Sequence, residues 1–293
     1  MSSKLWSSLL MLGLILSATT LAAAPIKALI IDGQSNPYHK LPAVTVESKQ
    51  ILESSGLFTV EVATSPAKGQ DMSGFQPNFA AYQVVVLNYD GDPWPAETQT
   101  AFEKYMQAGG GLVVVHSADN AFAGWKAFNE MIAVGGWGGR NEKSGPYLRF
   151  RGGKWEAVDM PGPGGSHGKP RPYVVTAREP SHPIMKGLPK EWLHVADELY
   201  DRMRGPAVNV TVLASAMTDP KTGGSGEEEP VLMTISYGKG RVFHSVMGHG
   251  PDEMKCVGFI VTLQRGTEWA ATGKVTQKVP ADFPTTTETK VRN

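Results

Sequence analysis

The chain has 293 residues, and its 28 Lys and Arg residues balance 28 Asp and Glu residues, so the formal net charge is zero. No long run of positive charge occurs, which argues against a nucleic-acid partner and against binding to an anionic membrane surface. The single cysteine, Cys256, excludes an intramolecular disulfide, so we expect the hydrophobic core alone to hold the fold together.

The first 24 residues are typical of a secretory signal peptide. They combine one lysine, an apolar run over residues 9–16 and a stretch of small residues that ends at Ala24. The apolar run is too short to span a bilayer, which requires roughly 20 residues. We therefore expect residues 1–24 to be removed and the mature protein to be secreted or periplasmic, without membrane contact. A signal anchor is the alternative.

The N-terminal half alternates short apolar runs with amphipathic segments. We predict strands at residues 27–32, 59–63, 83–91 and 112–118. A helix is predicted between the first two strands, and another before the fourth, where three consecutive glycines end it. This alternation predicts an α/β fold with a doubly wound, mostly parallel, flavodoxin-like sheet. Because such sheets bind ligands at the carboxyl ends of their strands, the loops that begin at Asp32, Asn88 and His116 are the candidates for a site.

The C-terminal half begins with a segment of different composition. Residues 135–178 are rich in Gly, Pro and aromatic side chains and lack helical periodicity, which predicts an insertion folded over the sheet with one hairpin. VTVLASA and VLMTISYGKGRVFHSVMG then predict strands, the last two joined by a Tyr-Gly-Lys-Gly turn. A final helix is predicted over residues 252–270. We expect one α/β domain over residues 25–284 and a disordered tail over residues 285–293.

Most of the seven histidines lie where a predicted strand ends or a loop begins. His116 follows the LVVV strand, His244 ends the GRVFH strand, and His249 lies in the next loop. If these strand ends are neighbours, three imidazoles converge, and imidazole suits both proton transfer and metal binding. The alternative for each is a polar cap of its own loop. For His39 and His194 we favour a surface or loop position.

Carboxylates and the glycine-rich insertion supply the other candidates. Asp197 and Glu198 are adjacent, so on a strand only one of them faces a given side. We place Glu198 in the pocket, with Tyr200 on the same face. Trp125 or Trp137 offers a flat surface for a sugar ring, and an arginine of the insertion can donate forked hydrogen bonds.

These arguments define a predicted site. The predicted catalytic residues are His116, Glu198 and His244. The predicted substrate-binding residues are Asp32, Asp119, Asn120, Trp125, Arg140, His167, Tyr200 and His249. A divalent metal, zinc or manganese, is an open option with His116, His244, His249 and Glu198 as candidate ligands, although no HExxH-like spacing connects them. Neither glycine run matches GxGxxG or GxxxxGK[ST], so no nucleotide cofactor is expected.

Several segments in sequence order resemble one known family. HSADNAFAGWKAFNEMI, GGWGGR, SHG, SHPIMKGLP followed by DELYD, VLASA, EPVLMTISYGKGRVFHSVMGH and RGTEWAATG are similar to the ThuA-like (trehalose utilisation) proteins. Their domain is related to the class I glutamine amidotransferase-like, flavodoxin-type fold, and the resemblance covers about residues 26–283. It implies a role in the metabolism of trehalose or related disaccharides.

The chain departs from true amidotransferases at the expected nucleophile. No GxCxG elbow follows the glycine-rich helix end, where VVVHSA stands instead, and Cys256 lies in an apolar segment. Glutamine hydrolysis is therefore not expected. We expect an exported carbohydrate-active enzyme that acts on a glycoside or keto-sugar, a sugar-sized molecule, by acid-base catalysis. The alternatives are a non-catalytic sugar-binding or scaffolding module and a hydrolase of a non-sugar ester or amide.

Overall fold

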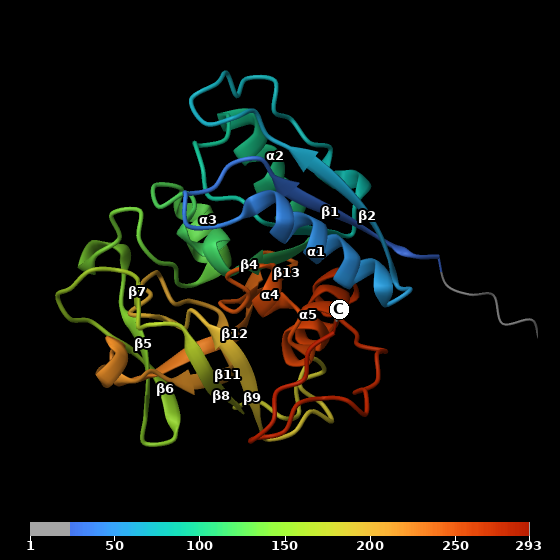
Figure 1. Ribbon diagram of the computed structural model, residues 1–293. Coiled ribbons are helices and arrows are strands. Elements are labelled where there is room, and N and C mark those ends of the chain that lie inside the picture. Colours follow the sequence, from blue (N-terminus) through green and yellow to red (C-terminus); the bar gives the residue numbers. More distant parts are fainter. Residues whose placement is uncertain (1–23, 293) are drawn as a thin grey trace, which may run out of the picture.

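The computed structural model describes residues 24–292 (Figure 1). The predicted signal peptide, apart from Ala24, therefore lies outside the described residues. Among the helices of the described range, none is both long and apolar enough to span a bilayer.

A nine-stranded sheet forms the centre of the molecule, in the order β2-β1-β3-β4-β13-β12-β11-β8-β9. Its parallel half comprises β1 (Ile26–Asp32), β2 (Phe58–Thr64), β3 (Val84–Leu87), β4 (Gly111–Val115) and β13 (Gly240–Ser245). Its antiparallel half comprises β12 (Glu228–Tyr237), β11 (Val210–Met217), β8 (Arg171–Ala177) and β9 (Glu191–Asp197). The predicted flavodoxin-like α/β fold is confirmed, and strands from the C-terminal half extend its sheet.

Helices cover both faces of the parallel half. Every residue of β3 and β4 is buried, as expected for parallel strands enclosed on both sides. The helices are α1 (Leu41–Ser54), α2 (Ala96–Gln107), α3 (Lys126–Ile132), α4 (Pro251–Met254) and α5 (Val257–Thr272). From β1 to β2 and from β3 to β4 the chain moves in opposite directions across the sheet, so right-handed crossovers place α1 and α2 on opposite faces. The fifth helix packs on α1, β4 and β13.

The C-terminal helix differs from its prediction in one respect. It is interrupted at Cys256, so that a short α4 precedes the long α5. The last residues, 285–292, for which the sequence favours disorder, are hydrogen-bonded to the domain. The Leu193 amide donates to the Thr285 carbonyl, and the Val257 amide donates to the Lys290 carbonyl.

The glycine-rich segment contributes both a hairpin and part of the main sheet. The hairpin consists of β5 (Tyr147–Arg151) and β6 (Lys154–Val158), and the segment's last residues form β8. Between the hairpin and β8 lies the two-residue strand β7 (Ser166–His167). It pairs with β10 (Tyr200–Asp201), which follows shortly after β9. This small pairing ties the insertion to the end of the antiparallel half. Within residues 24–292 the fold also contains four short 3-10 helices: η1 (Phe79–Ala81), η2 (His116–Asn120), η3 (Glu142–Ser144) and η4 (Pro220–Thr222).

The close approach of α5 to the sheet depends on Gly266. A Cβ atom added there would clash with the ring of Phe243, which is fully buried on β13. We expect Gly266→Ala to lower the free energy of unfolding by about 1–3 kcal/mol through overpacking, measured by urea denaturation. Gly124→Ala is the matched control, because a Cβ there has no neighbour within 4 Å. Unchanged stability of Gly266→Ala would contradict this packing.

Candidate functional site

A pocket of about 550 Å³ lies where the parallel strands end. The loop after β1 supplies Asn36, Tyr38 and His39 to its wall, and the loops after β3 and β4 supply Asp90 and Asn120. These strands are neighbours in the sheet, so their carboxyl ends open into one crevice, where sheets of this type bind ligands.

The opposite wall comes from the insertion and from the antiparallel half. Trp137 and His167 belong to the insertion, whereas Glu198 and Tyr200 follow β9. The edge of the Trp137 ring packs against Tyr200, with ring centroids 4.6 Å apart. Both halves of the sheet are therefore needed to form the pocket.

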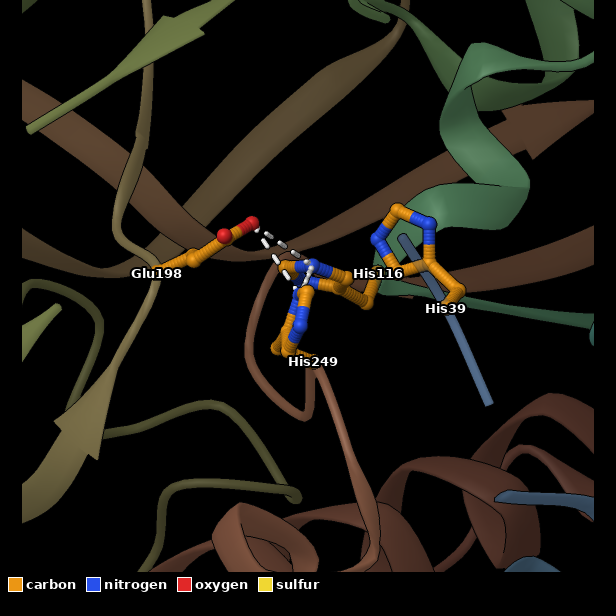
Figure 2. A group of neighbouring side chains, drawn as sticks. All are labelled: His39, His116, Glu198 and His249. Atoms are coloured by element: carbon orange, nitrogen blue, oxygen red, sulfur yellow. Dashed lines mark hydrogen bonds and ion pairs between the residues drawn. The ribbon is translucent and has the colours of Figure 1, made fainter. Parts of the chain in front are cut away.

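Three imidazoles and one carboxylate form a cluster at this pocket. We call His39, His116, His249 and Glu198 the His/Glu cluster; one ligand atom from each lies within 4.8 Å of those of the others. His249 Nδ1 lies 3.0 Å from Glu198 Oε2 and 3.3 Å from His116 Nε2. His116 Nε2 lies 3.8 Å from the same carboxylate oxygen. Figure 2 shows these three side chains joined by dashed lines, with His39 beside His116.

His116 is held in a strained turn directly after β4. Its φ angle of 44° lies in the left-handed region, and the chain then enters η2. Residues other than glycine adopt this backbone conformation at an energetic cost, and such strain concentrates at functional sites. The ring is buried, and its Nδ1 donates to the Val246 carbonyl at 2.7 Å. Because a carbonyl only accepts, Nε2 carries the free lone pair and faces the cluster.

A chain of hydrogen bonds orients His39. The Asn36 amide nitrogen donates to Asp90 Oδ2 at 2.9 Å, which turns the Asn36 oxygen toward His39 Nδ1 at 2.8 Å. That nitrogen must therefore carry the proton, and Nε2 is left for the cluster, 3.2 Å from the Tyr200 hydroxyl.

The surroundings drive the members of the cluster to different protonation states. Burial, together with the nearby His116 and His249, lowers the pKa of His39 to about 3. Burial opposes ionisation of Glu198, but its close contacts with His116 and His249 outweigh this effect and lower the pKa of Glu198. The hydrogen bond to Glu198 raises the pKa of His249. Neutral His39 thus lies next to an anionic carboxylate.

Asp197 lies beneath the cluster, fully buried, and fixes two of its members. Its carboxylate accepts the backbone N–H of Glu198 at 2.8 Å, of Gly248 at 2.8 Å and of His249 at 3.3 Å. It also accepts a hydrogen bond from His194 Nε2 at 3.0 Å. One side chain therefore positions both Glu198 and the loop that carries His249.

The structure brings together several predicted site residues. His116, His249 and Glu198 belong to the His/Glu cluster. Asn120, His167 and Tyr200, three of the predicted substrate-binding residues, line the pocket. Glu198 and Tyr200 reach it from the connection between β9 and β10 and from β10, rather than from one continuous strand.

The prediction that His244 joins the cluster is wrong. β13 continues to Ser245, and His244 is fully buried within it. Its Nε2 lies 3.2 Å from Asp119 Oδ2 and its Nδ1 lies 3.0 Å from the Ile132 carbonyl. This pairing also removes Asp119 from the pocket wall. Both ring nitrogens of His244 are therefore occupied within the core, whereas Asp119 Oδ1 has no hydrogen-bond partner among residues 24–292.

Three further predicted ligand-binding residues have structural partners instead. The Asp32 carboxylate accepts the hydroxyls of Thr45 and Thr64. The Trp125 indole donates to Glu103. The guanidinium of Arg140 is buried and donates to the carbonyls of residues 120, 121 and 136. None of the three lines the pocket.

Sequence reasoning missed the contribution of the first loop. A surface or loop position is expected for His39. It does lie in the loop after β1, but it belongs to the cluster, and Asn36 and Tyr38 line the pocket beside it. The signal was present, because all three follow the strand that ends at Asp32. His194, for which a surface or loop position is also expected, lies in β9 and is fully buried against Asp197.

Fold and site together define an α/β protein with a histidine and carboxylate pocket at the carboxyl ends of its parallel strands. The family model described as ThuA, trehalose utilisation, matches residues 27–270. The chain therefore belongs to the ThuA family.

Solved structures agree with this assignment. The crystal structure of a ThuA-like protein from Parabacteroides merdae is 52% identical, with a TM-score of 0.89 over 92% of this chain and 98% of that one. A ThuA-like protein from Bacteroides uniformis is 22% identical, with a TM-score of 0.59 over 88% of this chain and 96% of that one, and shares the fold. Among curated proteins, no sequence matches this chain.

Asp197 provides a test of how the site is held. We expect Asp197→Asn to lower the free energy of unfolding by about 3 kcal/mol, because the amide leaves buried donors and the partner His194 uncompensated. Urea denaturation measures this. The control is Asp252→Asn, whose side chain is 85% exposed and pairs with Lys255 at the surface, where such pairs contribute little. Equal stability of the two variants would contradict the assigned role.

Proposed function

We propose that the pocket binds a sugar-sized carbohydrate, a glycoside or keto-sugar, and that the His/Glu cluster acts on it by acid-base catalysis. The observation that carries this proposal is the convergence of a strained imidazole, His116, and an anionic carboxylate, Glu198, beside a pocket of sugar-compatible size. Pockets for small molecules commonly measure roughly 300–1,000 Å³. The family's description, trehalose utilisation, supports the same substrate class.

The pocket wall suits a sugar in two ways. Trp137 and the highly exposed Tyr38 offer aromatic surface against which the CH groups of a pyranose ring can pack. Asn120 offers an amide oxygen that has no hydrogen-bond partner among residues 24–292. Because a buried polar atom without a partner is costly, a ligand hydroxyl that donates to it would be favoured. Asn36 and Asp90 provide further polar atoms at the rim.

The cluster offers the groups that proton transfer requires. His116 Nε2 carries a free lone pair and is the candidate general base, while Glu198 and His249 form a hydrogen-bonded pair beside it. The left-handed backbone at His116 projects the ring from the end of the sheet. A module that only binds sugar has no need for such a strained imidazole, which favours an enzyme over a binding or scaffolding role.

Substitution of His116 separates these alternatives. A screen of disaccharides and their 3-keto derivatives with product analysis should identify a substrate of the wild-type protein. We expect His116→Ala to reduce turnover at least about 100-fold, since loss of a general base costs that much, while calorimetry still detects sugar binding. His182→Ala, at a partly buried histidine outside the pocket, should retain turnover. A wild-type protein that binds sugars but converts none would instead be a binding module.

Export belongs to the proposal as well. It is supported by the composition of residues 1–24, of which all but the last lie outside the described range. We expect the protein expressed from the full-length sequence to be found in the periplasmic or culture fraction with a new N-terminus near Ala24, checked by fractionation and N-terminal sequencing. Retention of residues 1–23 in a membrane fraction would favour the signal-anchor alternative.

A further inference from the structure

We propose that the His/Glu cluster binds one divalent transition-metal ion, with Zn²⁺ as the ion that it fits best. As a catalytic assignment this inference rests on the proposed function, but His116 would then be a metal ligand and no longer the general base, because the ion would use its Nε2 lone pair. As a binding site, the cluster can be tested without any substrate. The spacing of the four donors, the placement of their protons and the bonds that orient their rings support the site.

The spacing of the donor atoms matches a four-coordinate ion. Tetrahedral zinc with bonds of about 2.0–2.1 Å to nitrogen places neighbouring ligand atoms roughly 3.3 Å apart. His116 Nε2 and His249 Nδ1 are 3.3 Å apart, and Glu198 Oε2 lies 3.0 Å and 3.8 Å from these two nitrogens. A ring nitrogen of His39 completes the set, since all four ligand atoms lie within 4.8 Å of one another.

The placement of protons leaves lone pairs facing one another. His116 Nδ1 donates its proton to the Val246 carbonyl, so Nε2 has only a lone pair to direct at the cluster. Its neighbours there are an anionic oxygen of Glu198 and a nitrogen of His249. A single proton on His249 Nδ1 cannot fully satisfy both Glu198 Oε2 and His116 Nε2. A dication between the atoms would satisfy all of the lone pairs together.

Two of the imidazole rings are oriented by hydrogen bonds from the ring nitrogen that faces away from the cluster, as is common in metal sites. Histidines that bind metals usually donate their second ring N–H to a carbonyl or carboxylate, which fixes the tautomer and the ring plane. His116 does so to the Val246 carbonyl, and His39 does so to Asn36, which is itself held by Asp90. Two of the three imidazoles are therefore oriented before any ion binds.

The donor set also selects the class of ion. Three imidazole nitrogens and one carboxylate suit Zn²⁺ and related first-row ions, whereas Mg²⁺ and Ca²⁺ prefer oxygen ligands throughout. The cluster borders the pocket, where Glu198 and His249 keep side-chain exposures of 16% and 26%. Because the four protein ligands would fill a tetrahedral shell, a ligand from the pocket would reach the ion as a fifth ligand, an expansion that some catalytic zinc sites make.

Metal binding to the purified protein without an affinity tag tests the proposal directly. After treatment with a chelator, the wild-type protein should take up one Zn²⁺ per chain in calorimetry and in elemental analysis, and Mg²⁺ should not compete. We expect His116→Asn and Glu198→Gln to weaken Zn²⁺ binding at least about 100-fold, because each removes a ligand. Asn36→Ala keeps all four ligands but frees His39, and should weaken binding roughly 10-fold, as is usual for outer partners.

Controls keep the outcome clear. His182→Ala should bind Zn²⁺ like the wild type, and circular dichroism with thermal melting should show that each variant is folded. If His116→Asn fails to fold, the more exposed His249→Asn takes its place. Absence of stoichiometric Zn²⁺ in the wild type, or unchanged affinity in the ligand variants, would overturn the site. Stoichiometric Zn²⁺ without turnover of any sugar would uphold the site and contradict the proposed function.

Discussion

The buried carboxylate of Asp197 is the constraint on which the site depends. It ends β9 in the antiparallel half and accepts backbone N–H groups of Gly248 and His249, which follow β13 of the parallel half. Burying this charge is tolerable only because every part of it is hydrogen-bonded. Burial opposes a charge on its partner His194 as well, but the hydrogen bond to Asp197 raises the pKa of His194 to about 9. The two halves of the sheet are therefore joined through Asp197, which stays charged and is paired with His194.

This arrangement explains why the pocket needs the whole chain. The parallel strands alone deliver His39, His116 and His249 from loops at their carboxyl ends. The carboxylate of Glu198 comes from the far end of the antiparallel half, and the aromatic wall comes from the insertion through Trp137. A flavodoxin-like sheet without these additions would hold imidazoles but neither the acid nor the aromatic wall. The added segments thus supply what distinguishes this pocket from the bare fold.

Local patterns were sufficient to predict most of the fold. Uninterrupted apolar runs predicted the strands β3 and β4, and the Tyr-Gly-Lys-Gly turn predicted the β12–β13 hairpin. The predicted meeting of His116, directly after β4, and His249, in the loop after β13, is found in the cluster. The prediction for His244 was wrong because β13 continues for one residue beyond it. Within the strand its side chain faces the core instead of the pocket, and strand ends cannot be predicted to one residue. His39 was missed because it lies seven residues beyond Asp32, where only the folded loop returns it to the crevice.

The residue at position 116 shows how a shared fold can carry a different chemistry. The turn after β4 has the left-handed backbone that nucleophile elbows use to expose a reactive side chain, and here it presents an imidazole. The protein's sole thiol, Cys256, is instead buried at the start of α5, away from the pocket wall. A lone pair at this strained position can accept a proton or bind a metal ion, but it cannot form the thioester of a cysteine nucleophile. The backbone geometry therefore fixes where chemistry can occur, and the side chain placed there decides which chemistry it is.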